Sequence, residues 1–403
     1  MKFLYRILPR RLWPAAQRCS YETGSSPERE FAEARRLCNP LEPLGEGRNG
    51  GMNRMFMNRS AIKLANIDAI LDFSLTTYST TFPGKSFTVG LNQEHMQKSP
   101  ADKTFLFVDL CGSPGGFSEY IMKRYQKTSA SNPDDNTSRE VHGFGFSLIG
   151  RNEHGNGTTW RLPSTINKVS NGCQVNYQIC RGIDGSGDIY KWENVIDLQR
   201  TIFTDLQKSI GLTRQQQAKV HLVVADGGFD AQRDSEYQEE LSQKLVVCQV
   251  AAGLLLLLPS GTLVVKMFGF QTGVVRGVMQ SLNELFDEIM VLKPISSRPA
   301  SSERYVVCRG FHGVPDDWDG LLWRDSMLLG YPKLSLPSTD IGYFLDEFDR
   351  DLLSLNLKAC FAILSCLEGK EAALSNGSLL SIGGNPMHVP VDIEMYMRSW
   401  KLN

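Results

Sequence analysis

The fold of this chain is decided by residues 107–119, which read FVDLCGSPGGFSE. The apolar run from Phe105 predicts a buried strand, and the amphipathic run from Phe117 to Tyr125 predicts a helix. A strand, a glycine-rich turn and a helix in this order are typical of α/β proteins that present backbone N–H groups to a ligand at the carboxyl edge of the sheet. The spacing fits neither a phosphate-binding GxxxxGK loop nor a dinucleotide-binding GxGxxG loop.

Around this stretch, strand and helix patterns alternate up to about residue 310. Strands are predicted at 105–110, 142–146, 177–180, 221–225, 262–267, 288–292 and 305–308. Helices are predicted at 28–37, 58–73, 118–125, 192–210, 235–258, 274–286 and 341–367, and polar surface loops at 126–140 and 150–174. The alternation predicts an α/β fold with a mostly parallel seven-stranded sheet and helices on both faces.

The composition is that of an ordinary globular protein, with 41% hydrophobic and 22% charged residues in 403. Lys and Arg number 43 against 44 Asp and Glu, so RNA binding would need a local basic patch. The nine cysteines lack paired metal-ligand spacing, so we expect free thiols and no metal site. The longest apolar run, 245–259, is too short to span a bilayer, and no membrane contact is expected.

Three parts are expected along the chain. Residues 1–30 form a basic and disordered segment, with Lys2, Arg6, Arg10, Arg11 and Arg18 preceding the first acidic residue, Glu22. Such a segment is compatible with a mitochondrial targeting sequence, a nuclear address or an RNA-holding tail. The main domain covers 31–310 and opens with a helical segment, and 311–403 forms a helical extension packed on the core.

Four charged residues lie where a charge is costly unless it is used. Lys63 lies on an apolar helix, Asp226 follows the strand 221–225, Lys266 lies inside the strand 262–267, and Glu303 precedes the strand 305–308. Strand ends meet at the ligand edge of an α/β sheet, so Asp226 and Lys266 should converge beside the glycine-rich loop. Pairing would neutralise the charges and could lower the pKa of one lysine, which suits the orientation of a hydroxyl nucleophile. Taken singly, Asp226 could be a loop cap, Lys63 a surface residue, and Glu303 a partner of Arg298 or Arg304.

Together these segments resemble the FtsJ-type 2′-O-ribose methyltransferases, and most closely the branch that methylates the first transcribed nucleotide of capped mRNA. The similarity covers roughly 50–310 and lies in four ordered motifs, at 58–66, 111–120, 225–230 and 293–308. It implies a Rossmann-like S-adenosylmethionine-dependent methyltransferase. It also implies a catalytic tetrad in the family order, formed by Lys63, Asp226, Lys266 and Glu303.

The resemblance implies further roles for individual residues. The methyl donor S-adenosylmethionine would be contacted by Asn58, Cys111, Gly112, Ser113, Pro114, Gly115, Gly116, Phe117, Asp188 and Ile189, with Asp188 at the adenine edge. The capped RNA would be contacted by Glu236, Ser301 and Arg36. Lys266, with Asp226 and Lys63, would orient the 2′-hydroxyl and help to remove its proton, while Glu303 supports Lys266. The strand 141–147 ends without the acidic residue that often holds a ribose, and no metal is implied.

The expected partner is m7G-capped RNA, with the transcription or capping machinery as a second possibility and the nucleus as the expected location. Two other substrates stay open, the second cap nucleotide and ribosomal RNA, the latter in mitochondria if the basic start is a targeting segment; a cytoplasmic location also stays open. The chain could also be a cap-binding or scaffold protein without catalytic activity, but the complete tetrad disfavours this alternative. Trp160, Tyr190, Trp192, Phe229 and Phe270 are alternative platforms for stacking on the cap guanine.

Overall fold

The computed structural model describes residues 27–38, 56–76, 104–130, 139–149, 160–170, 172–210, 219–228, 237–329, 339–367 and 393–402. The helices there are α2 (Pro27–Leu37), α4 (Arg59–Ile70), α5 (Gly116–Ala130), α6 (Trp192–Ile210), α7 (Gln238–Leu256), α8 (Gly273–Leu285), α9 (Gly320–Leu328), α10 (Thr339–Leu367) and α11 (Ile393–Ser399). The strands are β1 (Thr104–Leu110), β2 (Arg139–Phe146), β3 (Thr165–Ser170), β4 (Cys173–Cys180), β5 (Val220–Ala225), β6 (Leu257–Met267), β7 (Phe286–Leu292) and β8 (Arg304–Phe311).

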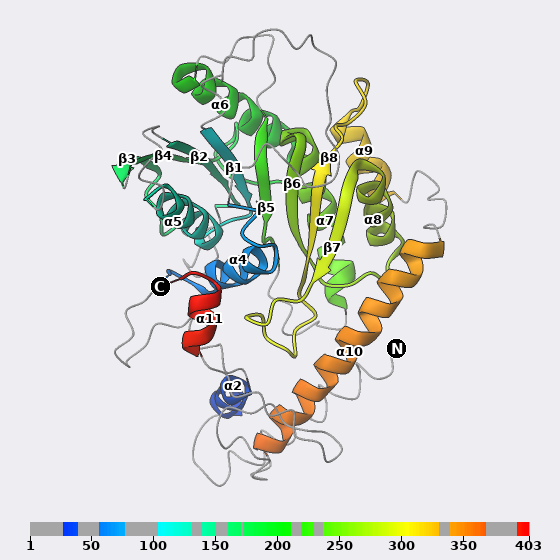
Figure 1. Cartoon of the computed structure of the whole chain (residues 1–403). Coiled ribbons are helices and arrows are strands. Elements are labelled where there is room, and N and C mark those ends of the chain that lie inside the picture. The colour runs from blue at the N-terminus through cyan, green and yellow to red at the C-terminus, as the bar shows by residue number, and fades with distance from the viewer. Residues whose placement is uncertain are drawn as a thin grey trace.

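The strands form one sheet in the order β3-β4-β2-β1-β5-β6-β8-β7 (Figure 1). Strands β4, β2, β1, β5 and β6 are parallel to one another, whereas β8 runs antiparallel to both β6 and β7. From β1 the chain builds outward to β2 and β4 on one side, and then returns to add β5 and β6 on the other. Ligands of open α/β sheets bind beyond the strand ends at this reversal.

The sheet has one strand more than the sequence predicts. Strand β3 lies within 150–174, which was predicted to be a surface loop, and it pairs antiparallel with β4 at the sheet edge. Its side chains are mostly exposed, with Val169 at 72%, so it lacks the apolar pattern of a buried strand. Pairing with β4 makes it a strand, and a single-sequence pattern does not record that pairing.

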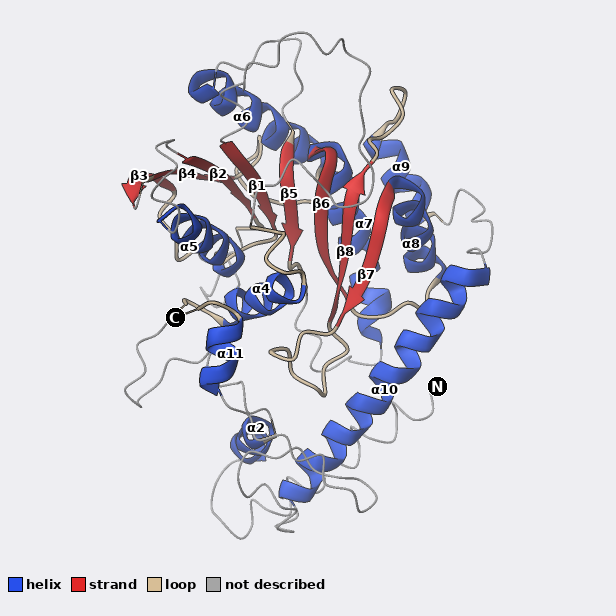
Figure 2. Cartoon of the chain, viewed as in Figure 1, coloured by secondary structure: helices blue, strands red, loops and turns tan. Residues whose placement is uncertain are grey.

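Helices cover both faces of the sheet, as predicted (Figure 2). Helices α6, α7 and α8 pack on one face in a cluster that includes Leu106 and Val108 of β1. Helices α4 and α5, with Trp400 beyond α11, pack on the other face with Phe105 and Phe107. The alternation along β1 follows from the period of two in a strand, and the uninterrupted burial of β1 is typical of a central parallel strand.

Helix α10 extends past the sheet and contacts α2 at its far end (Figure 1). Ala34 and Cys38 pack there against Ala362, Ile363 and Leu367 in a separate small cluster. None of the helices in the described ranges combines the length and apolar character that a membrane crossing requires.

Candidate active site

The four charged residues singled out in the sequence come together at the carboxyl edge of the central strands. Lys63 is on α4, Asp226 directly follows β5, Lys266 is the penultimate residue of β6, and Glu303 directly precedes β8. Because β8 runs against β6, the start of β8 and the end of β6 lie side by side, with Tyr305 paired to Lys266. The reversal of β8 therefore delivers Glu303 to the same edge as Asp226 and Lys266.

Lys266 and Asp226 form one ion pair of the site. Lys266 Nζ lies 3.0 Å from Asp226 Oδ1 and donates to the Asp226 carbonyl at 2.8 Å. The same carboxylate accepts from Tyr305 Oη at 2.8 Å and from Ser60 Oγ at 2.9 Å. With three donors from three elements, this carboxylate is fixed in place.

Lys63 and Glu303 form the other ion pair. Lys63 Nζ donates to Glu303 Oε2 at 2.7 Å, and Ser297 Oγ donates to Glu303 Oε1 at 2.7 Å. Glu303 is hydrogen-bonded to the first lysine of the tetrad, and it acts on Lys266 through its charge. The guanidinium of Arg304, named above as an alternative partner of Glu303, pairs with Asp349 on α10.

At Lys266 the electrostatics differ from the expectation of a lowered lysine pKa. Burial alone would lower the pKa of Lys266, but the charges of Asp226 and Glu303 outweigh it, and the pKa is raised. Burial alone would raise the pKa of Glu303, yet Lys63 and Lys266 hold it well below its usual range. Lys266 is therefore an ammonium group and Glu303 a carboxylate at neutral pH.

A third lysine lies behind the site and was missed in the sequence. Lys293 Nζ donates to the carbonyl oxygens of Ser301 at 2.6 Å and Glu303 at 2.8 Å, and lies 3.4 Å from Ser297 Oγ. It therefore fastens the loop that carries Glu303. Burial lowers its pKa to about 7. A lowered lysine pKa, which the sequence led us to expect within the tetrad, is therefore found at Lys293 beside it.

The glycine-rich loop packs between β1, α4 and α5. Asp109 Oδ2 accepts from the backbone N–H and the hydroxyl of Ser118 at 3.1 and 2.7 Å, and so ties the strand end to the first turn of α5. Cys111 has a left-handed backbone with φ of 55°, which turns the chain out of the strand. A Cβ on Gly116 would lie 1.9 Å from Asn58 Oδ1, the side chain that caps α4, so only glycine allows this close approach.

The predicted donor-binding residues lie together at this edge. Gly112 N–H donates to the Phe146 carbonyl at the end of β2. The loop that carries Asp188 and Ile189 reaches the same strand end, since Ile149 N–H donates to the Ser186 carbonyl at 2.7 Å. Buried polar atoms of Asp109 (Oδ1) and Ser113 (Oγ) have no hydrogen-bond partner among the described residues. These two groups without hydrogen-bond partners fit a polar ligand such as the methyl donor S-adenosylmethionine.

The residues predicted to contact RNA are only partly described. Ser301 is half-buried on the Glu303 loop, where its hydroxyl accepts from Glu303 N–H at 3.1 Å and its carbonyl from Lys293. Arg36 lies on α2, and its side chain is outside the described part of the chain, as is all of Glu236. Phe270 is fully buried against Arg304 and Phe348, so it is wrong as a stacking platform for the cap.

Two of the missed residues were detectable from spacing alone. Ser60 precedes Lys63 by three residues, which places both on one face of a helix. Tyr305 follows Glu303 by two residues, which places both on one side of an extended segment. Asp349 is 45 residues from its partner Arg304, and no local pattern connects the two. In the described ranges no three His, Cys, Asp or Glu side chains gather as a metal site would require.

Comparison with known proteins identifies a family and a set of relatives. The model of the FtsJ-like methyltransferase family matches residues 56–311. A Xenopus laevis protein named cap-specific mRNA (nucleoside-2′-O-)-methyltransferase 1 is 32% identical over 87% of this chain, and the match covers 37% of that protein. The Drosophila melanogaster protein of the same name is 31% identical over 70% of this chain and 29% of its own length.

One relative differs from these in its name. A Caenorhabditis briggsae protein named inactive cap-specific mRNA (nucleoside-2′-O-)-methyltransferase 1B is 31% identical over 71% of this chain and 30% of its own length. The chain spans about a third of the length of the curated relatives that it matches. Overall identity therefore does not separate active from inactive relatives, and the constellation of site residues has to do so.

Proposed function

Since the chain belongs to the FtsJ-like methyltransferase family, we propose that it transfers a methyl group from S-adenosylmethionine to the ribose 2′-oxygen of the first transcribed nucleotide of m7G-capped RNA. The observation that carries the proposal is the closed set of two ion pairs, Lys266 with Asp226 and Lys63 with Glu303. A catalytically silent protein would have no need to bury four charges at the ligand edge of its sheet. The names of the relatives in Xenopus laevis and Drosophila melanogaster favour a capped substrate.

In the proposed mechanism Lys266 acts as a cation. Its raised pKa keeps it protonated, so it cannot accept the hydroxyl proton. The ammonium group instead donates a hydrogen bond to the ribose 2′-oxygen and stabilises the negative charge that builds on it. Asp226, whose carboxylate already meets three donors, holds Lys266 and does not act as the base. The proton of the hydroxyl is released to solvent water.

The residues proposed to hold the methyl donor lie beside the tetrad. S-adenosylmethionine, when bound, supplies an electrophilic methyl group on sulfur. Asn58, the loop 111–117, Asp188 and Ile189 would hold it, with the unsatisfied oxygens of Asp109 and Ser113 as polar contacts. Ser301 and, in our proposal, Arg36 and Glu236 would contact the RNA. A preformed arrangement of this kind lowers the entropic cost of bringing two reactants into line.

The test of the substrate uses two short RNAs that differ only in an N7-methylguanosine cap. The expected result is transfer of label from S-adenosylmethionine to the capped RNA alone, with the label on the first nucleotide after nuclease mapping. Labelling of the second nucleotide would mean that the enzyme methylates that position in place of the first nucleotide. Equal labelling of both RNAs would contradict the cap-dependent proposal and favour a structured RNA such as ribosomal RNA.

The catalytic assignment predicts a large effect at Lys266. Lys266→Met removes the only proposed contact to the reacting oxygen, so turnover should fall by about 10²–10⁴-fold. The affinity for S-adenosylmethionine, measured by calorimetry, should change less than twofold because the donor contacts are on other elements. Lys358→Met, on α10, serves as the matched control. Normal turnover in the Lys266→Met protein would contradict the assignment.

Cap methylation acts on new transcripts, so we propose a nuclear location and contact with the transcription or capping machinery. Imaging of the tagged full chain, with capture of its partners, tests both statements. A mitochondrial signal would favour the alternative of ribosomal RNA as substrate.

A further inference from the structure

Helix α10 lies beyond residue 311, where the family match ends. We propose that α10 is a working part of the catalytic site and that Asp349 is a positioning residue, which acts through Arg304 to hold Glu303 and Lys266 in place. The expected loss of activity rests on the proposed function, whereas the expected loosening of the loop that carries Glu303 rests on the structure.

Arg304 is the link between α10 and the tetrad. It directly follows Glu303 and is 5% exposed, and its guanidinium pairs with Asp349, which is 6% exposed. Its Nη2 donates to the Phe268 carbonyl at 3.2 Å and its Nε to the Ser302 carbonyl at 3.1 Å. One side chain thus joins the segment two residues beyond Lys266 to the segment next to Glu303.

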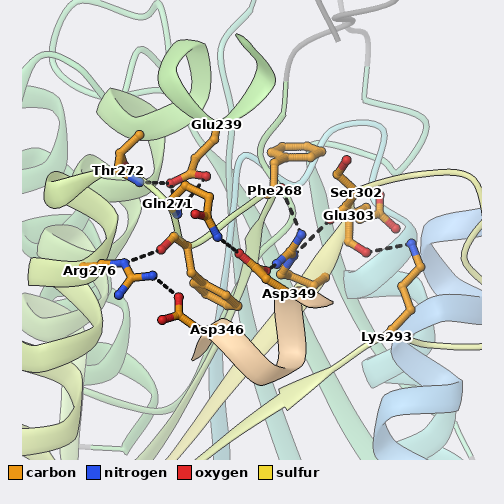
Figure 3. A network of polar contacts seen from close by, with 12 residues as sticks. Glu239, Phe268, Gln271, Thr272, Arg276, Lys293, Ser302, Glu303, Asp346 and Asp349 are labelled. Carbon is orange, nitrogen blue, oxygen red and sulfur yellow. Dashed lines mark hydrogen bonds and ion pairs between the residues drawn. The ribbon is translucent and has the colours of Figure 1, made fainter. Parts of the chain in front are cut away.

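Asp349 makes this link part of a larger network, which Figure 3 shows. Its second oxygen accepts from Gln271 Nε2 at 2.6 Å. The backbone N–H groups of Gln271 and Thr272 donate in turn to Glu239 on α7. The network therefore joins α7, the turn after β6, the start of β8 and α10. Asp349 is its centre, since each of its oxygens bonds to a different one of these elements.

A second contact from the same face of α10 reaches the same loop. The side-chain amide of Asn356, with its nitrogen toward the loop, donates to the carbonyls of Ser301 at 3.2 Å and Pro299 at 2.5 Å. Asp349 and Asn356 are seven residues apart, two helical turns along one face. Ala300 between these carbonyls packs against the cluster of α2 and α10. The loop that carries Glu303 is therefore held both by α10, through Asn356, and by Lys293.

The carboxylate of Asp349 balances the charge of the buried Arg304 guanidinium. Without the carboxylate of Asp349, Arg304 would lose a buried anionic partner next to Glu303, and we expect it to shift toward the Glu303 carboxylate. Such a shift would weaken the bond between Glu303 and Lys63 while leaving Asn58 and the loop 111–117 untouched. The expected signature is a loss in kcat without a loss in donor affinity.

The experiment compares Asp349→Asn with Glu347→Gln in the full chain. Glu347 is exposed on the same helix and loses the same charge. We expect kcat on capped RNA to fall at least tenfold in Asp349→Asn, with the dissociation constant of S-adenosylmethionine and the KM for RNA within twofold of wild type. Backbone amides of 300–304 should exchange hydrogen for deuterium faster, while those of 105–113 and 115–117 stay unchanged. Glu347→Gln should match the wild type in all four measurements.

Several outcomes would overturn the inference. These are a kcat within twofold of wild type in a folded Asp349→Asn protein, unchanged exchange at 300–304, or parallel losses of kcat and donor affinity. If Asp349→Asn does not fold, Arg304→Lys keeps the charge and loses the forked contacts, and the same criteria apply to it. If the wild type does not methylate capped RNA, the proposed function fails, and the exchange measurement alone decides whether Asp349 holds the loop.

Discussion

A buried lysine keeps its charge where an anion replaces the water that it has lost. Lys266 lies against the carboxylate of Asp226, and its pKa is raised. Lys293 donates mainly to carbonyl oxygens, and burial lowers its pKa to about 7, with Arg304 and Lys63 acting in the same direction and Glu303 against it. The type of oxygen that each lysine meets thus decides whether it works as a fixed cation or as a group that titrates near neutrality.

Lys293 predicts a pH dependence of stability. Its pKa is about 7 in the folded protein against 10.5 ordinarily, so between these values the unfolded chain binds a proton that the folded protein does not. Stability therefore rises with pH in this window, by up to about 1.4 kcal/mol per pH unit. Urea unfolding of the wild type and of Lys293→Met from pH 6.5 to 10 measures this. Only the wild type should gain that contribution, and parallel profiles would contradict the prediction.

At the scale of elements, the donor loop and the tetrad meet where α4 and α5 touch. Asn58 caps α4, which carries Ser60 and Lys63, and packs on Gly116 at the start of α5. Met57 N–H also donates to Glu119 of α5 at 2.8 Å. The N-terminus of α4 is thus a common support for the donor loop and for one lysine of the tetrad.

Gly116→Ala should separate these two elements. The new Cβ would lie 1.9 Å from Asn58 Oδ1 and 3.1 Å from the Ala61 nitrogen, so the cap of α4 must move. We expect the affinity for S-adenosylmethionine and the turnover both to fall by at least tenfold, measured by calorimetry and by methyl transfer. Gly273→Ala, at the start of α8, meets nothing within 4 Å and is the control. Unchanged donor affinity in Gly116→Ala would show that this contact is dispensable.

The elements that could be predicted from the sequence are those with a strong apolar period. Helix α6 has the predicted bounds 192–210, and the seven predicted strands are all present, although each extends further than its predicted range. Helix α7 ends two residues early because the chain enters β6 at Leu257. Strand β3 was missed because pairing with β4 forms it. The members of the tetrad were identifiable because charges in apolar segments stand out, whereas their pairing depends on the antiparallel course of β8.

At the scale of the whole molecule, the chain has a main body around the sheet and a small annex where α2 meets the end of α10. The annex has its own cluster of Ala34, Cys38, Ala362, Ile363 and Leu367, and Ala300 packs against it. Among the described residues few apolar contacts hold it, so it should open at a lower free energy than the sheet. Through Ala300 it nevertheless touches the loop of Glu303.

Ile363→Ala should loosen the annex selectively. Truncation of a buried isoleucine costs about 2–5 kcal/mol, and here the loss should be local. Hydrogen exchange should speed up in α2 and in the second half of α10, with β1 and β5 unaffected. Phe361→Ala, at an exposed position two residues earlier, should leave exchange unchanged. Faster exchange across the whole sheet would instead show that the annex and the body unfold as one unit.

The pairing of the four charges has a consequence for the response to ionic strength. Each pair sums to a formal charge of zero, and the side chains are only 10–13% exposed. Added salt screens exposed charges over about 8 Å at physiological concentration, but it acts weakly on buried pairs. Contacts with RNA phosphates, by contrast, release counterions and weaken steeply as salt rises. Raising the salt concentration should therefore raise the KM for RNA and leave kcat nearly constant. RNA binding and methyl transfer to the ribose can thus be separated in solution by ionic strength alone.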